Sequence, residues 1–317
     1  MLKAVRSIVR GLPYVRRLHS EIRDLKAELA RWRTWQPPGH FYSPVPSRAE
    51  VHADAELIFR NPSPPLGGVE LNEARQLELL KMFASYHDEL PKEWTRSGSA
   101  RYHYSNEYYS WADGIVLYCM LRNLHPKRVV EVGSGFSSAV ILDTDEMFLN
   151  NSIQCTFIEP HPQRLMSLVD EKDTTRVQVL EKRLQNAGME VFTALEAGDI
   201  LLVDSSHVTK TGSDLNRLVF EILPSLASGV YVHFHDVFYP FEYPRSWVEQ
   251  GIAWNEAYLL HAFLQYNSTF AIQFFVSYLV QCHRQMVMTC LPLAMNSEGT
   301  SPRITDAPGA SLWVMRV

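Results

Sequence analysis

Acidic and histidine side chains follow two apolar runs of the sequence, at the point where each run ends. One run ends at Asp204, and the next along the chain ends at His235 and Asp236. Because the carboxyl ends of parallel strands meet at one edge of a sheet, we expect these three side chains to converge. Two carboxylates and an imidazole suit Mg²⁺, Mn²⁺ or Fe²⁺ better than zinc. The sequence therefore predicts a divalent metal site formed by Asp204, His235 and Asp236.

A turn of small residues follows an earlier apolar run, in the stretch Glu-Val-Gly-Ser-Gly-Phe-Ser-Ser that begins at Glu131. Gly133 and Gly135 lack Cβ atoms, so the backbone is able to turn sharply and a ligand to approach it closely. Ser137 and Ser138 are suited to cap the next helix and leave its first N–H groups facing a ligand. The stretch predicts a nucleoside-binding turn, and an ordinary strand-to-helix turn is the alternative.

The glycine pattern distinguishes between two cofactors. A dinucleotide fingerprint, G-x-G-x-x-G, needs a third glycine, and Ser138 stands at that position. Glu-Val-Gly-Ser-Gly instead resembles the first motif of class I S-adenosylmethionine (SAM) methyltransferases, E/D-x-G-x-G. The resemblance implies that SAM is the cofactor. The residues of this stretch that it assigns to cofactor binding are Glu131, Gly133, Ser134, Gly135, Ser137 and Ser138.

A further acid, Glu159, ends the apolar run that follows the glycine turn. An acid about 20 to 30 residues after such a turn suits hydrogen bonding to the hydroxyls of a ribose. The resemblance assigns this role to Glu159 and makes Asp204 another cofactor contact. A plain surface acid is the alternative for Glu159.

The apolar runs alternate with helical patterns in the rhythm of a doubly wound α/β sheet. The expected strands are 128–132, 155–159, 176–180, 199–204, 229–234, 270–276 and 311–317. One helix is expected between each consecutive pair of the first five strands, at 137–149, 161–170, 186–196 and 213–226. A seven-stranded, mostly parallel, Rossmann-like sheet with an antiparallel last strand is what the resemblance implies, and it covers residues 105–317.

Two segments precede this expected methyltransferase domain. Residues 1–36 read as a basic amphipathic helix, and residues 37–104 read as a proline-rich arm followed by a helical cap at 69–90. Tyr102 to Tyr109 is rich in tyrosine and precedes a helix expected at 110–124. Such a segment covers the cofactor and substrate mouth in a methyltransferase, and surface packing of the tyrosines is the alternative.

The N-terminal helix carries apolar residues at alternating spacings of four and three, which is a heptad pattern. These residues are Leu18, Ile22, Leu25, Leu29 and Trp32. Docking on the protein's own domain, a short coiled coil in a homo-oligomer, and weak contact of the basic residues 3–17 with a membrane surface all remain open.

Composition excludes several classes of protein. The net charge of -5 gives no bulk attraction to nucleic acid. The four cysteines lack the spacing of a zinc site, and two fall in expected buried elements, which suits a reducing compartment. Because no apolar run reaches 18 residues and no signal-peptide core is evident, we expect a cytoplasmic protein without a transmembrane segment.

The D-x-x-H of Asp204 and His207, together with the His235-Asp236 pair, narrows the resemblance to metal-dependent sugar O-methyltransferases of the methyltransferase 24 type. In these enzymes a histidine at the offset of His207 looks like the general base, because a hydroxyl must lose its proton as it is methylated. The sequence departs from the family at His235, where a carboxylate is usual. A loop histidine that caps the following turn is the alternative for His207.

The expected function is SAM-dependent O-methylation of a saccharide or hydroxylated natural product, with a small-molecule or glycan acceptor and no nucleic acid partner. Asp204 and His207 are the expected catalytic residues. Two alternatives remain: a mononuclear iron oxygenase or hydroxylase that uses the same histidines and carboxylates, and a non-catalytic scaffold with a SAM fold.

Overall fold

The computed structural model describes residues 13–31, 34–60, 65–96, 98, 100–109, 111–298 and 308–317. The chain forms two compact units, Met1–Ile58 and Phe59–Val317. The domain boundaries expected after residues 36 and 104 stay predictions. Trp32 of the heptad pattern, residues 3–12 of the basic segment and residue 110 lie outside the described residues.

The first unit contains three helices in its described part: α2 (Pro13–Arg31), α3 (Arg48–Ala53) and α4 (Ala55–Ile58). The two short helices interrupt the segment expected to be an extended proline-rich arm. Ser47 begins α3 by accepting a hydrogen bond from the Glu50 backbone N–H at 3.4 Å, which satisfies one of the free donors at a helix start.

The second unit is built on a seven-stranded sheet in the order β3-β2-β1-β4-β5-β7-β6. Its strands are β1 (Arg128–Val132), β2 (Gln154–Ile158), β3 (Val177–Leu180), β4 (Ile200–Val203), β5 (Tyr231–Phe234), β6 (Phe270–Phe275) and β7 (Leu312–Arg316). The first five pair in parallel, and β7 is antiparallel to both β5 and β6. This confirms the predicted doubly wound fold.

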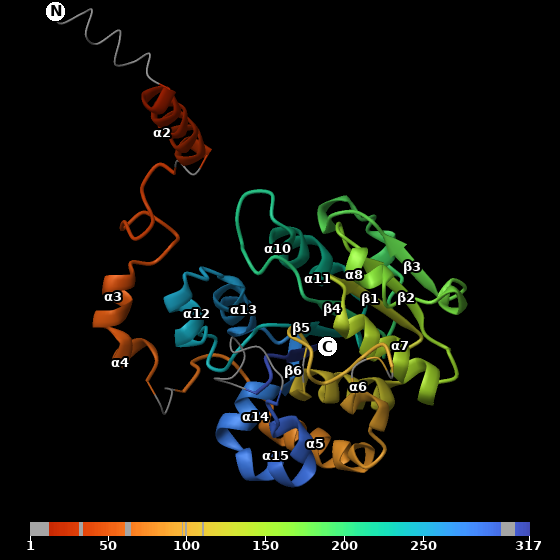
Figure 1. The fold of residues 1–317 in the computed structure, drawn as a ribbon. Coiled ribbons are helices and arrows are strands. Elements are labelled where there is room, and N and C mark those ends of the chain that lie inside the picture. Colours follow the sequence, from red (N-terminus) through yellow and green to blue (C-terminus); the bar gives the residue numbers. More distant parts are fainter. Residues whose placement is uncertain are drawn as a thin grey trace, which may run out of the picture. The chain divides into compact units, whose positions relative to one another are not determined.

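Helices cover both faces of this sheet (Figure 1). On one side α6 (Trp111–Leu124) packs beside α7 (Phe136–Phe148), and α5 (Glu73–His87) packs on α6 and β6. The other face is covered by α10 (Asp214–Arg217) and α11 (Leu223–Ser225). Because β4 and β5 are buried along their whole length, they read as continuous apolar runs rather than alternating ones.

The remaining helices surround the ends of the sheet. They are α8 (Gln163–Met166), α9 (Glu190–Thr193), α12 (Arg245–Gln250), α13 (Glu256–Leu264), α14 (Val276–Cys282) and α15 (Arg284–Cys290). Single-turn elements are η1 (Lys92–Thr95), η2 (Glu171–Asp173), η3 (Leu184–Asn186), the π-helical turn η4 (Leu218–Ile222) and η5 (Pro292–Met295).

The helices expected at 161–170 and 186–196 are much shorter in the structure. Only the four residues of α8 are helical in the first, which starts directly after Pro162. The second is divided into η3 and α9, with Gly188 between them. Gly188 is a poor helix former, and Pro162 fixes where α8 can start but does not account for its end at Met166.

The tyrosine-rich segment before α6 lies mostly in the core. Tyr102, Tyr104 and Tyr109 are buried, and the Tyr102 hydroxyl donates to the Tyr109 carbonyl at 2.8 Å. Tyr108 is half exposed, with the Arg164 guanidinium 3.9 Å from the centre of its ring. Surface packing therefore does not describe the three buried tyrosines.

Candidate active site

The glycine turn packs directly against the end of β4. Gly133 has φ +77°, and a Cβ added there would lie 1.7 Å from the Asp204 carbonyl oxygen. The Asp204 N–H in turn donates to the Val132 carbonyl at 2.8 Å. Only glycine readily adopts this left-handed conformation and leaves room for the Asp204 carbonyl. The ends of β1 and β4 are therefore held in direct contact.

Glu131 lies beneath this turn and ties it to the first turn of α7. Its buried carboxylate accepts hydrogen bonds from the hydroxyls of Ser137, at 2.5 Å, and Ser138. The Ser138 oxygen also accepts from the Gly135 N–H at 3.0 Å. Burial raises the pKa of Glu131 to about 8, although both serines act against it. The structure thus brings four predicted cofactor residues together, and their contact with SAM stays a prediction.

Glu159 reaches the same turn from the end of β2. Its carboxylate accepts from the backbone N–H of Ser134 at 3.2 Å and of His161 at 2.7 Å, and the residue is half buried. The Ser134 hydroxyl is buried and has no hydrogen-bond partner among the described residues. Glu159 therefore places a half-buried carboxylate directly beside the turn.

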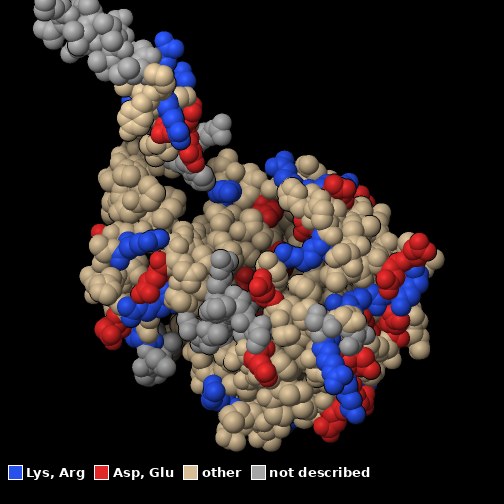
Figure 2. All heavy atoms as spheres, in the orientation of Figure 1, with Lys and Arg blue, Asp and Glu red and all other residues tan. Residues whose placement is uncertain are grey.

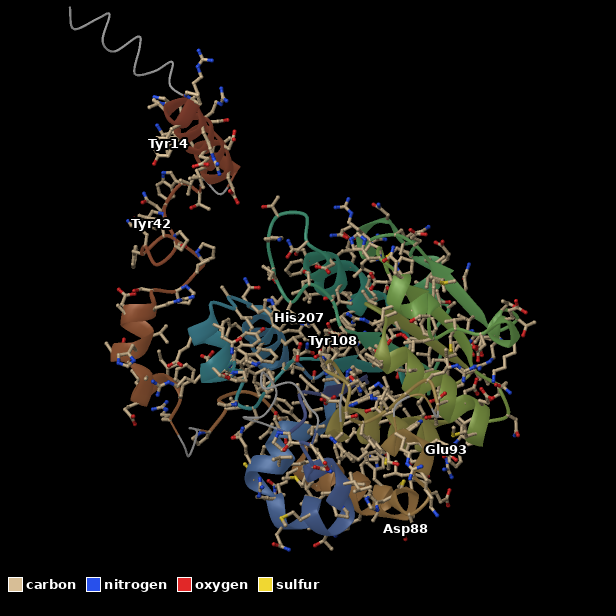
Figure 3. All side chains as sticks on the ribbon, viewed as in Figure 1. Tyr14, Tyr42, Asp88, Glu93, Tyr108 and His207 are labelled. Carbon is tan, nitrogen blue, oxygen red and sulfur yellow. The ribbon has the colours of Figure 1, made fainter. Side chains whose placement is uncertain are left out.

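The acids and histidines that follow β4 and β5 converge as expected, with His207 at their centre. Its Nε2 lies 3.2 Å from the Asp204 Oδ1 and 3.7 Å from the Asp236 Oδ2. Each of these three residues offers a ligand atom within 4.8 Å of the other two. His207 lies between the end of β4 and the start of α13 (Figure 3).

His235 lies beside this group but is not part of the three-residue set. Its Nδ1 is 3.5 Å from the Asp236 Oδ1 and 3.7 Å from the Asp204 Oδ1. Its Nε2 is 3.6 Å from Asp113 Oδ2, on α6. The metal-compatible set of the structure therefore differs from the predicted one by having His207 in the place of His235.

Two residues of the site have unusual backbone conformations. His207 has φ +58° and Asp236 has φ +60°, in the left-handed region that is unfavourable for residues with a Cβ. Such strain persists only where surrounding structure enforces it, and it clusters at functional sites. The start of α13 enforces it here, since the N–H groups of Asn255 and Glu256 both donate to the His207 carbonyl, at 3.1 and 3.2 Å.

Glu256 is a site residue that the sequence did not reveal. Its Oε2 lies 2.7 Å from the His207 Nδ1, and the residue is 1% exposed. Trp254 lies over the His207 ring at 4.2 Å between centroids. With Nδ1 bonded to Glu256, the other nitrogen of His207 is directed to Asp204 and Asp236. The only sequence signal is an acid at the start of an apolar helix, 49 residues from His207.

Asp113 is a second buried acid that sequence reasoning missed. It accepts hydrogen bonds from the Ala310 N–H at 2.9 Å and from the Ser311 hydroxyl. It therefore connects α6 to the start of β7 while it faces His235. Burial acts to raise the pKa of Asp113, but hydrogen bonds and the charge of His235 lower it by more. The pKa of Asp113 therefore lies below its usual range.

The electrostatics of the cluster favour charged forms. Burial acts to lower the pKa of His207, but hydrogen bonds to Asp204 and Glu256 outweigh it and raise the pKa well above its ordinary value. Burial acts to raise the pKa of Asp204, but the charge of His235 and the bond to His207 hold it below its usual range. The carboxylates around His207 thus favour its protonated form.

Aromatic residues form the wall beside this cluster. Tyr243 and Trp247 are buried, and the Tyr243 hydroxyl accepts from the Ala257 N–H at 3.0 Å. Trp247 and Trp254 meet edge to face at 5.3 Å. Tyr243 and Trp247 therefore pack within the fold rather than presenting a ring face to a ligand. Figure 2 shows acidic side chains inside a hollow of the second unit.

The converging set also bears on the iron-oxygenase alternative. A facial triad for iron has two histidines and one carboxylate, whereas the set here has one histidine and two carboxylates. Residues 130–237 match the family model of a methyltransferase domain. Together with the fold and its glycine turn, this match supports a class I SAM-dependent methyltransferase.

An uncharacterized protein of Archaeoglobus fulgidus is 36% identical over 165 residues, which is 50% of this chain and 73% of the archaeal one. Among solved structures, the SAH-bound methyltransferase PaMTH1 of Podospora anserina has a TM-score of 0.37 at 13% identity, over 71% of this chain and 90% of that chain. The O-methyltransferase TomG of Streptomyces achromogenes, in complex with SAM, has a TM-score of 0.39 at 15% identity, over 84% and 96%.

Of the helices in the part of the chain that the structure describes, none has both the length and the apolar character needed to cross a bilayer.

Proposed function

We propose that the protein transfers the methyl group of SAM to a hydroxyl oxygen of a small-molecule or glycan acceptor, with His207 as the general base. The observation that carries the proposal is the position of the His207 Nε2. It faces Asp204 and Asp236 at the edge of the sheet where the glycine turn also lies. A base and a cofactor turn at one strand edge are what methyl transfer to a hydroxyl needs.

The residues around the glycine turn fit the cofactor. The backbone at Gly135 is less crowded than that at Gly133, since a Cβ added at Gly135 would meet its nearest atom, the Arg164 Cδ, only at 3.4 Å. Glu159 stands where a carboxylate would bind the ribose hydroxyls. We assign cofactor binding to this group, with Glu131, Ser137 and Ser138 holding the turn in shape.

The chemistry that SAM supplies is an electrophilic methyl group on a sulfonium. The acceptor oxygen would form a bond to that carbon as the carbon–sulfur bond breaks. The electron pair of the broken carbon–sulfur bond would remain on sulfur. In the proposed reaction the His207 Nε2 takes the proton of the acceptor hydroxyl, and Glu256 stabilises the imidazolium through Nδ1. The proton then leaves His207 to solvent.

In this proposal the carboxylates of Asp204 and Asp236 would hold the divalent cation, and the His207 Nε2 beside them stays uncoordinated so that it can take the proton. Carboxylate oxygens suit Mg²⁺ or Mn²⁺. A cation there supplies positive charge that lowers the pKa of a bound hydroxyl. The same charge opposes protonation of His207, whose pKa the two aspartates otherwise raise.

The test is transfer of labelled methyl from SAM to a panel of sugars and hydroxylated small molecules, with and without a divalent cation. His207→Ala is expected to bind SAM with unchanged affinity and to lose transfer by a factor of about 10² to 10⁴. The matched control is His161→Ala, at an exposed histidine near the turn. Full transfer by His207→Ala would place the base elsewhere, and the absence of SAM binding to the wild type would overturn the proposal as a whole.

A further inference from the structure

The helix α2 exposes a continuous apolar stripe. Leu18, Ile22, Leu25 and Leu29 are 37%, 46%, 58% and 68% exposed, although they line one side of a 19-residue helix. Single exposed apolar residues are ordinary, but an ordered stripe of them marks an interaction surface. The stripe belongs to the first unit, whereas the cofactor turn and the acid–histidine cluster belong to the second.

The spacing places these residues at the seam positions of a heptad repeat. Ile22 and Leu29 occupy position a, with Val15 one heptad earlier, and Leu18 and Leu25 occupy position d. Val15 and Ile22 are β-branched and both d residues are leucine, a combination that favours two-stranded coiled coils, while Leu29 is the a residue without the branch. The pattern therefore fits a pair of helices better than a larger bundle.

The charges that flank the stripe differ in sign on its two sides. Position g is occupied by Glu21 and Glu28, whereas position e is occupied by His19, Lys26 and, outside the described residues, Arg33. In a parallel pair, g of one helix meets e of the other, so each glutamate faces a base. In an antiparallel pair g meets g and e meets e, which sets like charges together. Figure 2 shows both signs of charge on α2.

We propose that α2 is the dimerisation element of this protein, and that it pairs in parallel with α2 of a second copy. The Glu21 side chain is free to exchange partners, because its bond to Arg17 at 2.9 Å joins two exposed groups and contributes little. The segment after the helix also carries exposed aromatic residues, Trp35, Phe41 and Tyr42, and Tyr42 packs on both of the other rings.

A membrane surface is a less suitable partner for this stripe. A helix that lies on an anionic bilayer carries basic residues along its polar face beside the apolar one. Here one flank of the stripe is acidic over both heptads, at Glu21 and Glu28. A second copy satisfies these glutamates, whereas a bilayer of negative charge repels them.

The first experiment is sedimentation velocity of the full chain over a dilution series. Because the seam spans few heptads, we expect a concentration-dependent dimer rather than a permanent one. Ile22→Ala combined with Leu25→Ala keeps helix propensity but removes two seam layers, and it is expected to leave monomers. A wild-type chain that stays monomeric at every concentration, or a variant that dimerises as the wild type does, would overturn the proposal.

The second experiment tests orientation by charge reversal. In a parallel dimer, either single variant, Glu21→Lys or Lys26→Glu, places like charges opposite one another at two sites. Each variant should therefore raise the Kd of dimerisation about tenfold. An equal mixture of the two variants restores both attractions and should recover dimers that contain one copy of each. The matched control is Arg23→Glu at the outward position b, which should dimerise normally.

Two outcomes of the charge reversal contradict the proposal. Dimers of undiminished strength in both single variants would show that these flanks do not meet. Wild-type chain that stays monomeric in solution but sediments with vesicles of phosphatidylserine and phosphatidylcholine would assign the stripe to a membrane. Neither outcome depends on the proposed methyl transfer, because SAM binding in the second unit is measured separately.

Discussion

His207 is fixed on three sides: by Glu256 at Nδ1, by Trp254 against the ring face, and by two N–H groups of α13 at its carbonyl. The ends of two apolar runs predicted Asp204, His235 and Asp236 as the converging set, and the family resemblance pointed to His207. The sequence did not predict Glu256, because only the packing of α13 on the sheet edge brings that carboxylate to the histidine. Partners of this kind leave no spacing in the sequence to detect.

Glu256 provides the first prediction. Glu256→Ala is expected to lower kcat by roughly 10- to 100-fold while the Kd for SAM stays unchanged, because His207 loses the group that fixes its ring. Glu256→Gln keeps an acceptor for the Nδ1 proton and should recover part of the rate. The control is Glu249→Ala on α12, an exposed partner of Arg245. A kcat unchanged in Glu256→Ala, measured with labelled SAM, would remove the residue from the site.

Glu131 provides a prediction on pH. Its pKa of about 8 in the folded protein lies above the ordinary value of 4.5, since burial disfavours the charged form. The folded state therefore holds a proton that the unfolded state has lost. This contribution to stability is complete below pH 4.5 and disappears as the pH rises through about 8.

The measurement compares Glu131→Gln with the wild type in urea unfolding at several pH values. The free energy of unfolding of the variant should rise relative to the wild type between about pH 5 and pH 8, by up to about 1 kcal/mol per pH unit. The exposed Glu107→Gln serves as control and should follow the wild type. A constant difference between Glu131→Gln and wild type across this range would contradict burial of a protonated Glu131.

At the scale of elements, the sequence predicted the strands better than the helices. The central strands are mostly apolar and buried on both faces, with β4 apolar throughout and with Glu131 in β1 and His233 in β5 as buried polar exceptions, and such runs are easy to detect in a sequence. The helices predicted at 161–170 and 186–196 are longer than those in the structure. The prediction continued the apolar spacing across Pro162 and Gly188. Local backbone chemistry decided the helix bounds, and the pattern of apolar residues decided which segments pack on the sheet.

Arg101 joins elements that are distant in the sequence. Its guanidinium bonds to Asp143 of α7 at 3.1 Å and to Asp173 of η2 at 3.0 Å, and both carboxylates are buried. Arg101→Met leaves these two charges without this partner, which is expected to destabilise the protein by about 3 to 5 kcal/mol. Lys172→Met removes an exposed partner of the same network and should change stability little. Equal unfolding midpoints in urea for the two variants would contradict this account of Arg101.

At the scale of the whole chain, the two units carry different signals. The second unit contains the sheet, the cofactor turn and the acid–histidine cluster. The glycine motif and the alternation of apolar strands with helices predicted it from the sequence. The first unit carries the heptad stripe, whose partner no reading of one chain supplies. What the sequence could not give were the contacts between segments far apart along it, such as Asp113 with His235 and His207 with Glu256.

The division into units predicts which changes alter ligand binding. A ligand that binds only the folded protein stabilises it by about 2.7 kcal/mol when its concentration is a hundred times its Kd. SAM and Mn²⁺ are each expected to raise the Tm of the wild type. Asp204→Asn with Asp236→Asn should abolish the shift with Mn²⁺, because these oxygens form most of the converging set.

The dimerisation variant Ile22→Ala with Leu25→Ala is the matched control for this last measurement. Its changes lie in the first unit, so the Tm shifts with SAM and with Mn²⁺ should both equal those of the wild type, even where the absolute Tm falls with loss of the dimer. A shift with Mn²⁺ that persists after both aspartates are replaced would move the cation away from this site. A SAM shift that depends on Ile22 and Leu25 would show that cofactor binding requires the paired helices, and the two units would then act as one.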